Sequence, residues 1–175
     1  TERVAILGKN GCGKSTLLKI ILDQQTPDDG EIKLGASVKV GYLDQEVGFD
    51  NEDNTILETM QRFLGISEGK TRGVLAKFLF YDEDVFKRVS SLSGGERSRL
   101  RLCQLMNQDV NLLVLDEPTN HLDIGSREML EDALLSFEGT IIFVSHDRYF
   151  VNKIAKRVIE IRDKKLNYYI GNYDY

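Results

Sequence analysis

Eight residues near the start of the chain, 8–15 (GKNGCGKS), have the types and spacing needed to bind phosphate groups. Glycines in such a loop let backbone N–H groups turn inward, so that successive amides and the positive end of the next helix surround phosphate oxygens. In this pattern Lys14 reaches the β- and γ-phosphates, and the Ser15 hydroxyl binds Mg²⁺. The sequence therefore predicts a site for a nucleoside triphosphate. The candidate contacts are Gly8, Asn10, Gly11, Cys12, Gly13, Lys14, Ser15 and Thr16.

The segments on either side of this loop are those that a phosphate loop requires. Residues 4–7 are apolar and predict a strand, and residues 16–22 follow as a helical run. This context disfavours the alternative, which is a glycine-rich turn that binds no ligand.

Two carboxylates follow a second apolar run, residues 112–115. A continuous apolar run indicates a central parallel strand, whose carboxyl end is where ligands lie in open α/β sheets. Asp116 is therefore placed to hold Mg²⁺ through its shell, and Glu117 to polarise water. The alternative is two solvated acids at a strand end. Residues 140–144 predict another strand, which brings His146 to the same edge, although a lone histidine there is more often structural.

The segment LSGGE, residues 92–96, begins a helix over residues 97–106. Ser93 and Glu96 have the spacing of a capping box, which needs no ligand. Two glycines and a hydroxyl at a helix start also make a second anion site, so both interpretations hold together.

The length and composition favour one domain with an inserted lobe, because 175 residues with 41% apolar content bury one core. The remaining periodicity predicts strands over 31–34 and 38–43, helices over 54–64, 70–80 and 124–137, and a hairpin over 157–161 and 165–170. The core is expected over residues 1–45 and 108–175, with a helical lobe over 46–107.

Charge and cysteine content restrict the partners and the compartment. A net charge of −5 does not attract nucleic acid or anionic lipid over the whole surface, so such partners would need a local patch. No apolar run approaches the length that spans a bilayer. Cys12 and Cys103 have no metal-binding spacing, and such a pair of cysteines suits a reducing cytoplasm. Thr1 lies directly before a strand without an initiator Met, so we expect a piece of a longer polypeptide.

With GKNGCGKS, Gln45, LSGGE, LLVLDEP and His146 in this order, the chain resembles the nucleotide-binding domain of ABC ATPases from end to end. The strings EPTNHLD (117–123), VSHDRYF (144–150) and the closing IGNYDY resemble the ABC-F branch. The stretch from LDIGSREMLEDAL to FEGT is most similar to the second of the two domains in those proteins. The resemblance implies a P-loop NTPase fold of ABC type, with a mostly parallel sheet and with N-terminal strands outside this chain.

The resemblance also implies roles for individual residues. Gln45 senses Mg²⁺ and the attacking water, Glu117 is the catalytic base, and His146 contacts the γ-phosphate. ATP and Mg²⁺ are the implied ligands, with Ser15, Gln45 and Asp116 at the metal. The residues expected to act in trans, on ATP held by a second ABC domain, are Ser93, Gly94 and Gly95, with Asp123 in the loop that crosses the interface. An aromatic residue that stacks on adenine is expected upstream of the phosphate loop, outside this chain.

Three functions follow as hypotheses from this resemblance. The first is a cytoplasmic ABC-F ATPase that acts on ribosomes, as a translation factor or in antibiotic resistance, without inserting into membranes. The second is the ATPase subunit of a membrane transporter. The third is a scaffold that binds ATP without hydrolysing it, which the intact set of Lys14, Asp116, Glu117 and His146 disfavours.

Overall fold

The computed structural model describes residues 1–172, so the last three residues of the closing string IGNYDY lie outside the described part. The chain divides into two units. The first holds Thr1–Asp44, Asp109–Thr119 and the residues from Glu138 onward, and the second holds Gln45–Gln108 and Asn120–Phe137.

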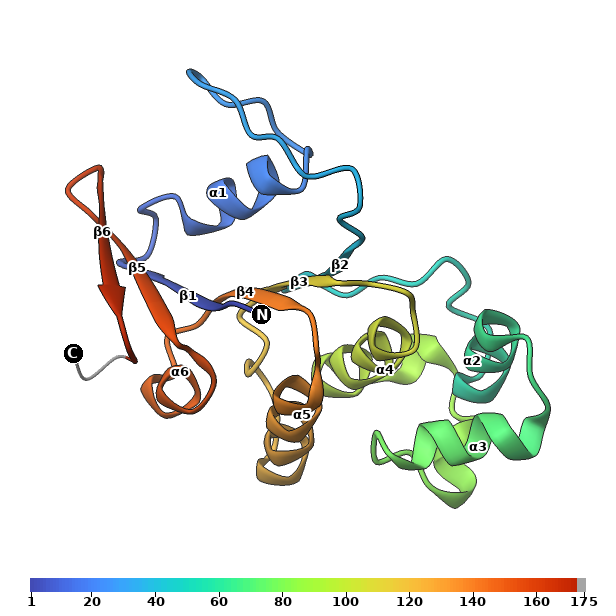
Figure 1. Ribbon diagram of the computed structural model, residues 1–175. Coiled ribbons are helices and arrows are strands. Elements are labelled where there is room, and N and C mark those ends of the chain that lie inside the picture. Colours follow the sequence, from blue (N-terminus) through green and yellow to red (C-terminus); the bar gives the residue numbers. More distant parts are fainter. Residues whose placement is uncertain (173–175) are drawn as a thin grey trace. The chain divides into compact units, whose positions relative to one another are not determined.

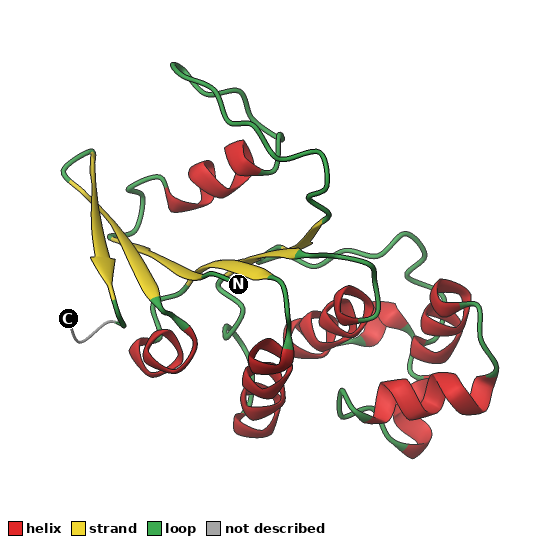
Figure 2. Cartoon of the chain, viewed as in Figure 1, coloured by secondary structure: helices red, strands yellow, loops and turns green. Residues whose placement is uncertain are grey.

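The first unit is built on a six-stranded sheet, which Figures 1 and 2 show. The strand order is β2-β3-β4-β1-β5-β6, and every neighbouring pair is parallel except β5 with β6. The strands are β1 (Arg3–Gly8), β2 (Val40–Leu43), β3 (Leu112–Asp116), β4 (Thr140–Val144), β5 (Arg157–Arg162) and β6 (Lys165–Ile170). The predicted α/β fold with a mostly parallel sheet is confirmed.

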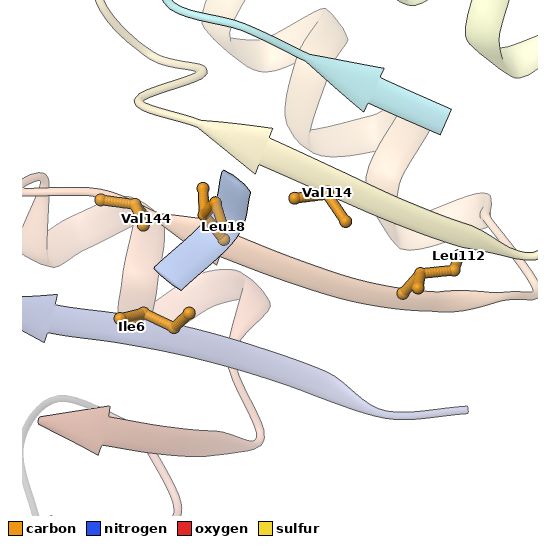
Figure 3. Close-up of a cluster of buried hydrophobic side chains, with 5 residues drawn as sticks. All are labelled: Ile6, Leu18, Leu112, Val114 and Val144. Carbon is orange, nitrogen blue, oxygen red and sulfur yellow. The ribbon is translucent and has the colours of Figure 1, made fainter. Parts of the chain in front are cut away.

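Helices α1 (Lys14–Ile21) and α6 (Arg148–Ile154) lie on opposite faces of this sheet (Figure 1). On the α1 face the core is a cluster of buried aliphatic side chains, drawn in Figure 3: Ile6, Leu18, Leu112, Val114 and Val144. On the other face the rings of Phe143 and Phe150 meet edge to face with their centroids 5.3 Å apart. Apolar burial on both faces explains why β3 is a continuous apolar run.

The second unit is helical. Its elements are α2 (Ile56–Leu64), α3 (Glu68–Ala76), the 3₁₀ helices η1 (Asp82–Phe86) and η2 (Val89–Ser91), α4 (Gly94–Met106) and α5 (Ile124–Ser136). Capping boxes begin α2 at Thr55 and α4 at Ser93, and the second of these confirms the prediction from the S-x-x-E spacing.

Three local predictions differ from the structure. Residues 31–34 form no strand: Ile32 and Leu34 are 45% and 43% exposed, and no neighbouring strand among the described residues pairs with them. Helix α3 ends at Ala76 rather than near residue 80, because Leu79 has a φ of 64°, which no α-helix continues. Residues 120–137, expected with the core, group with the helical unit because α5 packs against α4.

Among residues 1–172, no helix combines the length and the apolar composition that crossing a lipid bilayer requires.

Candidate functional site

The phosphate loop connects the carboxyl end of β1 to the amino end of α1, as the sequence predicts. The backbone turns at Gly11 and Gly13, whose φ angles of 76° and 105° lie in the left-handed region that glycine adopts most easily. Gly8 is needed for space, because a Cβ atom there would lie 2.5 Å from Sγ of Cys12. Since α1 begins at Lys14, its unpaired N-terminal amides follow the loop directly.

Lys14 spans this loop with its ammonium group. The residue is only 7% exposed, and its Nζ atom donates hydrogen bonds to the carbonyl oxygens of Gly8, at 2.9 Å, and Lys9, at 3.0 Å. A buried ammonium held over a ring of backbone amides creates a strongly positive site for an anion. Asn10 and Thr16, also predicted to contact phosphate, are exposed to solvent on this loop and helix.

A cavity of about 880 Å³ adjoins the loop within the first unit. Its wall combines the loop, the edge that follows β4, and the β5–β6 hairpin. The lining side chains with polar groups from these three segments include Lys9, Asn10, Cys12, Ser145, His146, Arg162 and Asp163. Its lining does not include Lys14, Ser15 or Asp116, so the cavity lies beside the groups assigned to the triphosphate and the metal.

Asp116 ends the buried strand β3 and is 3% exposed. The Ser15 hydroxyl faces the Asp116 carboxylate closely enough to influence its pKa. The Oδ1 atom of Asp116 is buried and has no hydrogen-bond partner in the described part of the chain. Burial raises the pKa of Asp116, and the Ser15 hydroxyl and the Lys14 charge partly oppose this rise. A buried, unpartnered carboxylate oxygen is costly unless a cation or a water molecule binds it.

These oxygen atoms fit Mg²⁺. Hard carboxylate and hydroxyl oxygens are the ligands that Mg²⁺ prefers, and Asp116 and Ser15 supply both at one place. Within residues 1–172, no group of three His, Cys, Asp or Glu side chains is arranged to hold a metal ion unaided. Phosphate oxygens and water commonly supply further Mg²⁺ ligands in phosphoryl-transfer sites.

Glu117 is held by contacts to β4 and to His146. It has a φ of 49°, and its backbone N–H donates to the carbonyl oxygen of Val144 at 2.9 Å. The Oε2 atom accepts a hydrogen bond from the backbone N–H of His146 at 3.3 Å, and Nε2 of His146 lies 3.2 Å from Oε1. Burial raises the pKa of the Glu117 carboxyl, while the charge of His146 lowers it. A fixed carboxylate with a raised pKa can act as a general base.

Two further polar residues, which the sequence reasoning missed, lie at the same edge of the sheet. The register pairs Leu43 of β2 with Leu115 of β3, so Asp44 comes directly opposite Asp116. The Tyr42 hydroxyl lies close to the Asp44 carboxylate. Burial first, and the charges of Asp44 and Asp116 next, raise the pKa of Tyr42. The sequence shows an acid at the end of each of these two strands: Asp44 directly follows β2, and Asp116 is the last residue of β3.

The LSGGE segment lies in the second unit, at the start of the 13-residue helix α4. Oγ of Ser93 accepts a hydrogen bond from the N–H of Glu96, and the Glu96 carboxylate accepts one from the N–H of Ser93. Gly95 packs against the loop before α5, because a Cβ atom on Gly95 would lie 2.7 Å from the carbonyl oxygen of His121. A Cβ atom on Gly94 would meet only the His121 ring, at 4.0 Å.

Asp123 and Gln45 also belong to the second unit. Asp123 caps α5 by accepting a hydrogen bond from the N–H of Ser126 at 2.7 Å, and this bond lowers the pKa of Asp123. Gln45 is exposed and is the first residue of the unit. The structure thus brings the predicted loop residues together with Asp116, Glu117 and His146 in one unit, and Ser93, Gly94, Gly95 and Asp123 in the other.

Comparison with protein families gives a match of residues 1–120 to the model described as "ABC transporter". The chain is 50% identical to "Putative ATP-binding protein YdiF" of Bacillus subtilis over 99% of its length and 27% of that protein. It is 47% identical to "ABC transporter F family member 5" of Arabidopsis thaliana, over 99% of this chain and 26% of that protein. It is 42% identical to "Energy-dependent translational throttle protein EttA" of Escherichia coli K12, over 97% of this chain and 32% of that protein. The chain therefore spans about a quarter to a third of these relatives.

Among solved structures, the chain is similar to archaeal ribosome recycling factor aABCE1, solved in complex with ribosomal stalk protein aP1. The TM-score is 0.74 and the identity 27%, over 90% of this chain and 31% of that chain.

Proposed function

Since the chain belongs to the ABC transporter family of ATP-binding domains, with relatives in its F branch, we propose that it binds ATP with Mg²⁺ and hydrolyses the β–γ phosphate bond. The observation that carries this proposal is the buried Glu117 carboxylate. It is held by His146 and lies at the same strand end as Asp116, which lies close to Ser15 of the phosphate loop.

In this proposal the loop and Lys14 bind the triphosphate, while Ser15 and Asp116 hold Mg²⁺. When bound, Mg²⁺ neutralises charge on the β- and γ-phosphate oxygens. Glu117 accepts a proton from the attacking water as the water oxygen bonds to the γ-phosphorus and the bond to the bridging oxygen breaks. His146 fixes the Glu117 carboxylate and contacts the γ-phosphate. The products are ADP and inorganic phosphate.

A second ABC domain completes the site. Gln45 senses the metal and the water, and Ser93, Gly94 and Gly95 bind the γ-phosphate of ATP on the partner domain's phosphate loop. The start of α4 supports this proposal, because unpaired N-terminal amides and small residues there favour the binding of an anion. Loss of one such donor typically lowers a rate by about a hundredfold or more. Turnover per molecule of the 175-residue chain should therefore rise with its concentration; fast, concentration-independent turnover would refute the composite site.

We propose further that the whole protein is a cytoplasmic ABC-F factor that binds ribosomes, with this chain as the second of its two domains. Two comparisons support the ribosome as partner: the likeness to a protein named as a translational throttle, and the likeness to a ribosome recycling factor. A role in translation or in antibiotic resistance follows from such binding.

The experiment uses the full-length protein with Glu117→Gln. The amide keeps the size of the carboxylate but accepts no proton, so nucleotide binding should persist while hydrolysis falls by roughly a hundred- to ten-thousandfold. The ATP-bound variant should cosediment with ribosomes and inhibit translation, whereas Lys14→Ala should bind nucleotide weakly and do neither.

Each outcome separates one part of the proposal. Cosedimentation of Glu117→Gln with membrane vesicles, and not with ribosomes, would indicate the transporter alternative instead. Hydrolysis by Glu117→Gln near the rate of the unsubstituted protein would show that another group is the base.

A further inference from the structure

The carboxyl ends of β2 and β3 place two carboxylates side by side. Tyr42 pairs with Val114 and Leu43 with Leu115, so the next residues along the two strands, Asp44 and Asp116, stand opposite each other. The electrostatic influence of Asp44 on Asp116 agrees with this placement.

Both carboxylates belong to the face of the sheet that α1 covers. Side chains alternate along a strand, so Asp44 shares its face with Tyr42, and Asp116 shares its face with Val114. Val114 lies in the buried cluster with Leu18 of α1 (Figure 3). Tyr42 is partly buried and packs against that cluster. The face therefore carries an apolar core that ends in two acids, next to the first turn of α1.

One of these acids is exposed, and the other carries a buried oxygen atom without a partner. The Asp44 carboxylate is exposed to water and lies close enough to the Tyr42 hydroxyl to raise its pKa. The Ser15 hydroxyl acts on Asp116, but the buried Oδ1 atom of Asp116 has no hydrogen-bond partner in the described residues. The ammonium groups of Lys14 and Lys19 also act on Asp116 and lower its pKa.

We propose that Asp44 accepts hydrogen bonds from the water molecules that Mg²⁺ retains when it is bound with ATP. This inference rests on the proposed function of the site. Mg²⁺ gives up its water reluctantly, so it would keep part of its water shell when Ser15 and Asp116 hold it. The retained water molecules would need hydrogen-bond acceptors, and the Asp44 carboxylate stands beside Asp116 at this edge. Asp44 is thus a positioning residue for the metal, outside its direct ligands.

The test measures metal binding and not turnover. The full-length protein is saturated with a non-hydrolysable ATP analogue and titrated with Mn²⁺, a paramagnetic substitute for Mg²⁺, while free Mn²⁺ is followed by electron paramagnetic resonance. Loss of a partner outside the direct ligands typically costs about 10–100-fold in metal affinity, so Asp44→Asn should weaken Mn²⁺ binding by that factor.

Two variants define the specificity of this effect. Asp109→Asn removes the same charge before the other end of β3, where the side chain is 84% exposed and pairs with Lys39, and it should leave the Mn²⁺ affinity unchanged. Tyr42→Phe removes the hydroxyl beside Asp44 and should produce a smaller loss than Asp44→Asn.

Binding of the analogue without metal separates this role from structural damage. Asp44→Asn removes a negative charge beside the site proposed for the triphosphate, so metal-free binding should be equal or tighter. Weaker binding both with and without metal would overturn the inference, as would a Mn²⁺ affinity within twofold of the unsubstituted protein. If the unsubstituted protein bound neither analogue nor Mn²⁺, the proposed function itself would fail.

Discussion

The side chain and the backbone of His146 hold different oxygens of one carboxylate, that of Glu117. Nε2 lies 3.2 Å from Oε1, and the backbone N–H donates to Oε2 at 3.3 Å. The ring is half exposed while the Glu117 side chain is buried. The histidine therefore both orients the carboxylate and places a titratable charge at its solvent side.

This relationship predicts a pH profile for ATP hydrolysis by the full-length protein. Burial raises the pKa of Glu117, so the acidic limb of the profile should lie above the ordinary range of a glutamate, because a protonated carboxyl accepts no proton. The charges of His146 and Lys14 lower this pKa, and that of Asp116 raises it. Removing the imidazole with His146→Gln should therefore raise the pKa of Glu117 and move the acidic limb to higher pH. An unmoved limb would show that the ring does not act on Glu117.

The burial of Asp116 predicts how the free energy of unfolding depends on pH. Burial raises its pKa in the folded state, so the folded chain binds this proton more tightly than the unfolded chain. Its contribution to the free energy of unfolding is then full below the ordinary aspartate pKa and is lost as pH rises through the folded-state pKa. Without nucleotide, Asp116→Asn should raise the Tm of the chain at pH 7 and not at acidic pH. A change of 1 kcal/mol in the free energy of unfolding shifts the Tm by about 2–4 °C for a chain of this size, and calorimetry resolves such a shift. The exposed Asp109→Asn control should show no such dependence.

Much of the fold could be predicted because the signals were local. The strand at Thr140–Val144, the hairpin strand at Lys165–Ile170 and the cap at Ser93 follow from apolar runs and short spacings that neighbouring residues determine. The phosphate loop was predicted for the same reason, since its glycines carry their conformation with them.

The errors arose where tertiary partners decide the outcome. Residues 31–34 have strand composition but no strand to pair with in the described part, and composition alone does not stabilise a strand. Helix α6 was missed although Asp147 caps it, because its run of apolar residues is short. The Asp44 and Asp116 pair needed the strand order and register, which no single segment contains.

Cys12 provides a chemical probe of nucleotide binding. It is partly exposed in the phosphate loop and lines the adjoining cavity, so bound ATP should cover it. Alkylation should slow by about a hundredfold when the free nucleotide is 100 times its Kd, because only the empty fraction reacts. Cys103 is an internal control: it is buried, and burial raises its pKa to about 12, so it should not react in the folded chain. Mass spectrometry of the labelled peptides measures both rates, and equal Cys12 rates with and without ATP would contradict the predicted coverage.

The two glycines of LSGGE should respond differently to the same substitution. Gly95→Ala places a methyl group 2.7 Å from the carbonyl oxygen of His121, so the backbone must shift, at a cost of about 1–3 kcal/mol. Gly94→Ala meets only the His121 ring at 4.0 Å, and alanine favours a helix, so this variant should be as stable as the unsubstituted protein. Urea unfolding of both variants measures the difference. In the full-length protein, ATP turnover should fall more in Gly95→Ala than in Gly94→Ala, because the shift displaces the segment proposed to bind the partner's γ-phosphate. Equal unfolding free energies for the two variants would show that the loop of His121 yields without cost.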